Sequence, residues 1–204
     1  MKIPSWKEIW YFIWEDNSIY SWLVNIVLAF VLIKFIVYPM LSMILSTSFP
    51  IVAVVSSSME HRLEFDAWWG NNKNWYQSAG ITKEEFLSYP MRNGFNKGEI
   101  IFLIGKQPKD IKRGDIIVFR SGRPDPIIHR VVKFKQINGE FIFSTKGDNN
   151  KGQLKDFFVD ETTIHQSQVI GVSVFRIPWL GYVKIFSTDL VCKAYPFKFC
   201  LAQR

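Results

Sequence analysis

The chain has 204 residues, a formal charge of +7 and a hydrophobic content of 48%. That length fits one domain with an appendage, and the mean hydropathy of +0.05 is high for a soluble protein. Only three basic residues (Lys2, Lys7 and Lys34) precede residue 62, so the positive charge belongs to the rest of the chain. No segment resembles a nucleic-acid module, and the charge favours solubility or anionic lipid instead.

Residues 1–20 form a Trp-rich head. In its stretch "WKEIWYFIW" a helical period places Trp6, Ile9, Trp10 and Ile13 on one face. This pattern predicts a short helix that lies in the membrane interface.

Residues 21–50 contain a long apolar run, with Asn25, Lys34 and Ser42 as its clearly polar members. A helix needs about 20 mostly apolar residues to cross a bilayer. A removable signal peptide has a shorter apolar core, so we interpret this run as one retained transmembrane anchor. Its limits stay open: Lys34 either snorkels from a span of 22–45 or marks the near end of a span of 35–55. A buried core helix is the alternative.

Residues 51–204 are expected to form a β-rich domain. The β-branched run "IVAVV" at 51–55 predicts a buried strand. Asn138-Gly139 between two apolar runs predicts a tight hairpin. Short strands separated by turn residues indicate a mainly β fold, a sandwich or a barrel. The further predicted strands are 99–105, 115–120, 127–137, 140–146 and 168–177.

An insertion at about 62–97 interrupts this pattern. It contains Trp68, Trp69 and Trp75 and has no sustained hydrophobic period. A short helix is expected near 82–88, with Thr82 as its N-cap. The Glu85 side chain is expected to complete a capping box by accepting from the Thr82 backbone N–H. The insertion has two open roles: it caps the β-rich domain, or its Trp side chains enter the membrane interface.

Cys192 and Cys200 near the C-terminus are too few for a zinc site without nearby histidines. A disulfide in an extracytoplasmic domain and two free thiols remain equal alternatives.

Three short stretches carry candidate catalytic residues. "VVSSSMEH" at 54–61 offers serines, "PIIHRVV" contains His129, and "TKGDNN" contains Asp148. A nucleophilic hydroxyl needs a base to remove its proton, and the base needs a carboxylate that fixes its tautomer. Each stretch alone reads more simply as a linker, a core histidine or a turn. Spacing cannot show whether the three residues meet in space.

Together these stretches resemble the type I signal peptidases, in the branch found in archaea and the endoplasmic reticulum. The resemblance covers residues from roughly 20 to 186, through short motifs in the family's order. They are "SSSME" at 56–60, "KRGDIIVF" at 112–119, "IIHRVV" at 127–132, "TKGDNN" at 145–150, and "VIG" with "FRIPWLGYVK" at 169–184.

The resemblance implies that Ser58, the serine before Met, is the nucleophile. It also implies an oxyanion hole formed by the Ser58 N–H and the Ser56 hydroxyl. His129 stands where the bacterial branch has a Lys base. Arg130, its neighbour in a strand, is expected on the opposite face in a structural role.

The third catalytic residue stays open. Asp148 matches the family's Gly-Asp-Asn, but the family's second Asp would fall on Leu154. A two-residue loop insertion would bring Asp156 to that place, so Asp156 is preferred as the partner of His129, with Asp148 shaping the site. Asp160 is a further candidate.

His61 replaces the Pro that the family usually has after Met-Glu. It is either a competing base or the residue that loosens the turn before the insertion.

The expected function is that of a membrane-bound serine endopeptidase that removes signal peptides from secreted preproteins, without a metal or cofactor. Expected partners are preproteins, the lipid bilayer and, as candidates, neighbouring secretion-channel proteins, but no nucleic acid. The expected location is the cell membrane, in the archaeal manner, with a single span and the catalytic domain on the extracytoplasmic side. Two alternatives remain: an inactive preprotein-binding module and a processing protease with a narrow substrate set.

Overall fold

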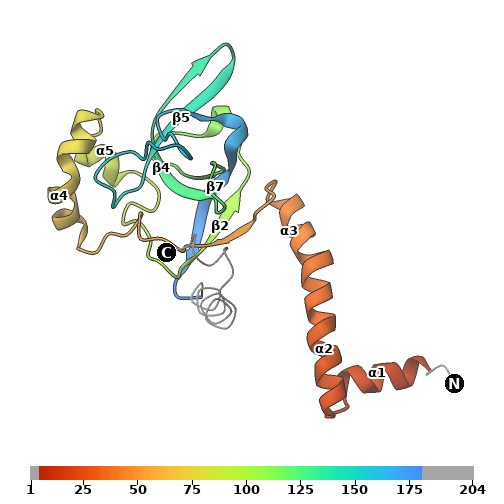
Figure 1. Cartoon of the computed structure of the whole chain (residues 1–204). Helices are drawn as coiled ribbons and strands as arrows, with labels where there is room; N and C mark the ends of the chain where they lie inside the picture. The colour runs from red at the N-terminus through yellow and green to blue at the C-terminus, as the bar shows by residue number, and fades with distance from the viewer. Residues whose placement is uncertain (1–4, 181–204) are drawn as a thin grey trace. The chain divides into compact units, whose positions relative to one another are not determined.

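A computed structural model describes residues 5–180 of the chain (Figure 1). The chain forms two compact units, Met1–Ile44 and Leu45–Arg204. Cys192 and Cys200 lie outside the described residues, so the disulfide alternative stays a prediction.

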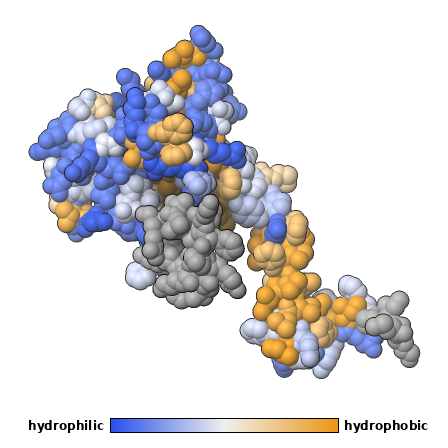
Figure 2. Space-filling view, in the orientation of Figure 1, coloured by the Kyte–Doolittle hydropathy of each residue, from blue (hydrophilic) through white to orange (hydrophobic). Residues whose placement is uncertain are grey.

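The first unit is helical. Its elements are α1 (Trp6–Trp14), α2 (Ile19–Leu32), the π-helical turn η1 (Ile33–Val37) and α3 (Tyr38–Ile44). The last three join into one helix, Ile19–Ile44, whose 26 residues have a mean hydropathy of 2.3 in the most apolar window. Hydrophobic side chains cover its exposed surface (Figure 2). This helix is long and apolar enough to cross a membrane.

The helix limits agree with the first interpretation of the anchor, a span of 22–45. Lys34 lies inside the helix, within η1. The alternative span of 35–55 is wrong, because the helix ends at Ile44 and Ile51–Ala53 form a strand.

Polar side chains fix the bend between α1 and α2. The Ser18 hydroxyl caps α2 by accepting a hydrogen bond from Ser21 N at 3.2 Å. Asn25 donates to the Ile13 carbonyl at 2.9 Å. The side-chain amide of the partly buried Asn25 therefore has a hydrogen-bond partner within the apolar run.

The second unit is built on a seven-stranded antiparallel sheet in the order β1-β2-β7-β3-β4-β5-β6. This confirms the mainly β prediction, and most predicted strands agree with the observed ones to within one residue. The strands are β1 (Ile51–Ala53), β2 (Ile100–Ile104), β3 (Ile116–Phe119), β4 (Ile127–Ile137), β5 (Glu140–Lys146), β6 (Ile164–His165) and β7 (Val169–Ile177). Single 3-10 turns, η2 (Pro108–Asp110) and η3 (Gln166–Gln168), lie between them.

The β4–β5 hairpin turns at Asn138-Gly139, as predicted. Both residues have positive φ, 52° and 86°, which a type I′ turn requires at its two central positions. The turn pairs Ile137 with Glu140 and fixes the register of β4, the strand that carries His129.

The insertion contains two helices, α4 (Phe65–Ser78) and α5 (Lys83–Leu87). Helix α5 and its Thr82 cap confirm the prediction, but Glu85 accepts a hydrogen bond from Tyr89 at 2.6 Å instead of closing a capping box. Helix α4 was not predicted.

Burial explains why α4 forms. Trp68 and Trp69 are only 3% and 5% exposed and pack with Tyr76 and Phe86 in an aromatic cluster. This packing favours the capping role of the insertion over insertion of these two side chains into the membrane.

A buried ion pair joins this insertion to the sheet. Arg130 of β4 and Asp148, just after β5, are both fully buried, and an Arg130 Nη donates to an Asp148 Oδ at 2.6 Å. Tyr76 of α4 donates to the same carboxylate at 3.1 Å. Arg130 also donates to the Pro90 and Gly114 carbonyls, each at 2.9 Å.

Lys146, at the end of β5, lies beside this pair. Its ammonium donates to the Gly147 carbonyl at 3.0 Å and lies 4.7 Å from the centre of the Tyr76 ring. Burial lowers the pKa of Lys146 from 10.5 to about 8, although Asp148 acts in the opposite direction.

Replacing Lys146 by Met should remove a pH dependence of stability. Between about pH 8 and 10.5 the unfolded chain binds the Lys146 proton and the folded chain does not. The wild-type free energy of unfolding should therefore rise with pH across this window, by up to about 3 kcal/mol for this one group. Lys146→Met should lack this rise in urea unfolding followed by tryptophan fluorescence in mild detergent.

Lys133→Met is the control, because Lys133 is an exposed lysine on β4. It should keep the wild-type slope. If the free energy of unfolding of Lys146→Met rose with pH as steeply as that of the wild type, the lowered pKa of Lys146 would be contradicted.

Candidate active site

Ser58 lies in the turn that follows β1. Met59 anchors this turn, because its side chain is buried with Val54, Phe95 and Leu103. Asn149 N donates to the Ser58 carbonyl at 2.8 Å. The half-buried Ser58 is thus held by the buried Met59 on one side and by Asn149 on the other.

His129 lies opposite Ile117 in the β3–β4 ladder and is buried. Its Nε2 is 2.9 Å from Ser58 Oγ. The structure thus brings together two residues that are 71 positions apart in the sequence, at the distance a general base needs.

The acceptor at His129 Nδ1 is Glu161, which was not among the predicted residues. Its carboxylate is buried and also accepts hydrogen bonds from the Thr145 hydroxyl at 2.9 Å and from Leu154 N at 2.5 Å. These donors fix the orientation of Glu161, and Glu161 fixes the orientation of the imidazole.

Asp156, the preferred third residue, lies elsewhere. It pairs with Arg123 at 2.6 Å and accepts from Phe158 N and Val159 N at 2.8 and 3.0 Å. Hydrogen bonds from Phe158 and Arg123 hold the pKa of this exposed carboxyl below its ordinary value. Glu161, and not Asp156, therefore lies beside His129 Nδ1. Asp160, the further candidate, accepts hydrogen bonds from Thr162.

Asp148 faces Arg130 on the side of β4 opposite to His129, since neighbouring residues in a strand point to opposite faces. Burial alone would raise the pKa of Asp148, but Arg130 and His61 hold it well below its ordinary value. The expected structural role of Arg130 agrees with this pairing.

His61 contacts Asp148 as well, with 3.1 Å between Nε2 and Oδ2. Its ring stacks on Trp68, with the ring centroids 3.7 Å apart. The loop 91–94 packs against His61: a Cβ at Gly94 would lie 2.7 Å from a ring carbon of His61. His61 is therefore built into the junction between the Ser58 turn and α4.

The Ser56 hydroxyl lies 3.1 Å from Ser58 Oγ. This separation allows it to donate to an oxygen that develops next to Ser58. Ser57 instead contributes its carbonyl, which accepts from the Asn149 side chain at 3.0 Å.

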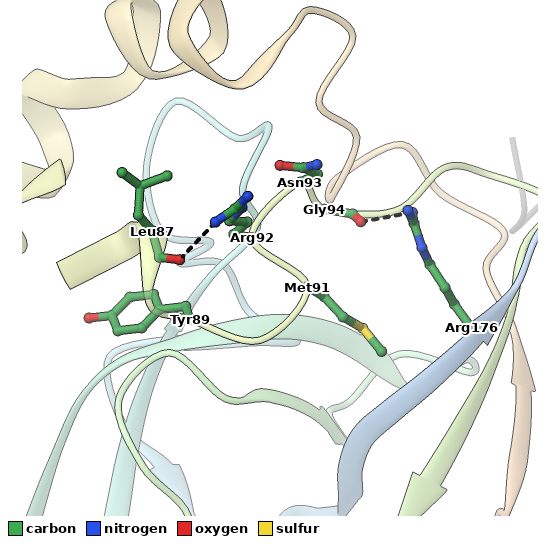
Figure 3. A pocket seen from close by; sticks show the side chains of 7 residues that line it. All are labelled: Leu87, Tyr89, Met91, Arg92, Asn93, Gly94 and Arg176. Carbon is green, nitrogen blue, oxygen red and sulfur yellow. Dashed lines mark hydrogen bonds between the residues drawn. The ribbon is translucent and has the colours of Figure 1, made fainter. Parts of the chain in front are cut away.

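An open pocket is lined in part by the loop 91–94 that packs against His61 (Figure 3). Arg176 donates to the Gly94 carbonyl at 3.1 Å and Arg92 to the Leu87 carbonyl at 3.4 Å (Figure 3). Tyr89, Met91 and Asn93 complete its lining. Within residues 5–180, no group of three or more His, Cys, Asp or Glu side chains is arranged to hold a metal ion.

Comparison with known proteins gives a consistent relationship, although no family model matches the chain. Human signal peptidase complex catalytic subunit SEC11C is 34% identical over 119 residues, which cover 56% of this chain and 59% of the relative. The SEC11 subunit of Colletotrichum graminicola is 33% identical over 106 residues, 50% of this chain and 62% of the relative.

Human putative subunit SEC11B is 32% identical over 118 residues, which cover 56% of this chain and 71% of the relative. The match to the SEC11C relatives spans 59% of their length. These relationships confirm the resemblance found in the motifs, and the chain belongs to the family of signal peptidase complex catalytic subunits.

Proposed function

We propose that this protein is a membrane-bound serine endopeptidase that removes signal peptides from preproteins. One observation carries the proposal: Ser58 Oγ lies 2.9 Å from His129 Nε2, while His129 Nδ1 contacts Glu161. A hydroxyl, a base and an orienting carboxylate in this order are the parts that acyl transfer by serine requires.

Catalysis begins when His129 takes the Ser58 proton and Ser58 Oγ attacks the scissile carbonyl. Glu161 keeps the proton on His129 Nδ1, so Nε2 is free to accept, and it stabilises the imidazolium that forms. The tetrahedral oxyanion is stabilised by the Ser58 N–H and the Ser56 hydroxyl, donors that the family resemblance implies.

The intermediate collapses as His129 gives its proton to the leaving amine. The signal peptide is then held as an ester on Ser58 Oγ. His129 next takes a proton from a water molecule, which attacks the ester and releases the signal peptide with a new carboxyl group.

The sheet edge supports binding of an extended substrate. In the described part of the chain β1 is an edge strand, paired only with β2, and it leads directly into the Ser58 turn. An extended peptide can add backbone hydrogen bonds at such an edge, while side-chain pockets give specificity. Small side chains are expected at the first and third positions before the scissile bond.

The membrane supplies the substrate. The helix Ile19–Ile44 is a candidate span near the N-terminus, and 13 residues lie between its last residue and Ser58. A single span with the β-rich unit on the extracytoplasmic side of the cell membrane would hold the site where a preprotein emerges. The tether raises the effective concentration of the site for membrane-embedded substrates.

Ser58→Ala and His129→Ala should each lower the rate of preprotein cleavage in liposomes by about 10⁴–10⁶-fold, because each removes a reacting group. Ser57→Ala is the matched control and should stay close to wild type, since Ser57 contributes its carbonyl and not its hydroxyl. Cleavage is read on gels and the new terminus by mass spectrometry. A wild-type protein that binds preprotein without cutting it would instead indicate an inactive binding module.

Glu161→Gln should lower kcat by about 10²–10⁴-fold with little change in KM, because the neutral amide no longer stabilises the imidazolium. Asp156→Asn is the control: its carboxylate serves Arg123 and the turn at 156–159. It should stay within about threefold of wild type, as expected for an exposed polar change outside the site. The reverse order of effects would assign the third position to Asp156.

A further inference from the structure

Two exposed phenylalanines lie in the turn between Leu154 and Glu161. Phe157 is 95% exposed and Phe158 55%, and their rings meet edge to face with centroids 5.2 Å apart. Phe157 is the most exposed large hydrophobic side chain among residues 5–180. Single hydrophobic residues scattered over a surface are normal, whereas adjacent exposed hydrophobic side chains can mark an interaction site.

The turn is held firmly, so the exposure of Phe157 is not that of a loose loop. Asp156 N donates to the Val159 carbonyl at 2.8 Å, and the Asp156 carboxylate accepts from Phe158 N and Val159 N. Gly122 N donates to the Phe158 carbonyl at 2.8 Å. A Cβ at Gly122 would lie 3.1 Å from that carbonyl oxygen, so the two segments are in close contact.

The turn belongs to the end of the β-rich unit where the chain arrives from the helix Ile19–Ile44. Gly122 follows Arg120 by two residues, and the Arg120 guanidinium lies 5.9 Å from the centre of the Phe49 ring. Phe49 is five residues beyond Ile44. Five residues reach at most about 18 Å, so a helix placed in a bilayer keeps this end of the unit near the membrane surface.

The chemistry of the turn suits lipid better than a charged partner. Arg123 pairs with Asp156 at 2.6 Å and Lys155 with Asp160 at 3.5 Å. The ion pairs leave the aromatic pair as the dominant feature of the turn. Apolar side chains such as Phe bury themselves at the boundary between lipid headgroups and acyl chains.

We propose that Phe157 and Phe158 form a second membrane contact, inserting into the interface of the lipid bilayer beside the span. The base of the turn is closed by Leu154, whose N–H donates to Glu161 at 2.5 Å and whose carbonyl accepts from Glu161 N at 2.9 Å. The turn that touches lipid is therefore continuous with the carboxylate that orients His129. The inference assumes the span and does not depend on peptidase activity.

The test replaces Phe157 by photoreactive benzoylphenylalanine in the full chain, reconstituted in phosphatidylcholine vesicles. The matched control carries the probe at Phe134, which is 43% exposed and lies on β4 seven residues beyond Ile127. After illumination, lipid adducts are quantified by mass spectrometry. We expect several-fold more lipid adduct at 157 than at 134, unchanged by molar salt because the contact is apolar.

The crosslinking is run on Ser58→Ala protein, first without preprotein and then with it, so that failure of the proposed catalysis does not affect the result. Equal lipid adduct at the two positions would overturn the proposal. Adducts that move from lipid to added preprotein would also overturn it and assign the turn to the substrate.

A second measurement uses Phe157→Ser. It should slow cleavage of a membrane-embedded preprotein several-fold and leave cleavage of a short soluble peptide in detergent unchanged. An equal loss with both substrates would mean that Phe157 serves the fold of the site and does not contact lipid.

Discussion

The buried pair of Arg130 and Asp148 is the interaction on which the rest of the β-rich unit depends. Both side chains are fully buried, and removing one partner of such a pair typically costs about 3–5 kcal/mol, because a charge is left without compensation. Arg130 is the neighbour of His129 on β4. Asp148 is the neighbour of Asn149, whose N–H holds the Ser58 carbonyl. One ion pair therefore sets the position of the base relative to the turn that carries the nucleophile.

The insertion strengthens the same junction from outside the sheet. Tyr76 of α4 donates to Asp148, and His61 contacts it while stacking on Trp68. Burial is the first cause that raises the pKa of Tyr76 well above its ordinary value, and Asp148 adds to it. Tyr76 therefore stays a neutral donor, so the aromatic cluster and the ion pair form one structural support behind the Ser58 turn.

Local sequence patterns predicted the parts of the fold that local chemistry determines. The hairpin follows from Asn138-Gly139, because few other dipeptides accept positive φ at both positions. The strands follow from β-branched runs. Helix α4 did not follow, since its glycine and asparagines are weak helix formers and its stability comes from burial of Trp68 and Trp69.

The candidate site also contains residues that local motifs predicted and one that they did not. Ser58 and His129 were predicted from motifs, and they lie within hydrogen-bonding distance. Glu161 was missed because sequence spacing led to Asp156. The chain has Leu154 where the family's spacing places an Asp, and the carboxylate that contacts His129 comes instead from the buried Glu161, seven residues later. A carboxylate that acts through space can come from any position; the only available signal was an acidic residue just before the short strand β6.

The proposed mechanism requires a covalent ester on Ser58 Oγ. The most direct measurement is acid quenching of the full chain during turnover of a preprotein in vesicles, followed by peptide mapping. We expect a signal-peptide ester on the peptide that contains Ser58, located on that serine by fragmentation and absent in His129→Ala. An ester on Ser56 or Ser57, or continued cleavage by Ser58→Ala, would contradict it.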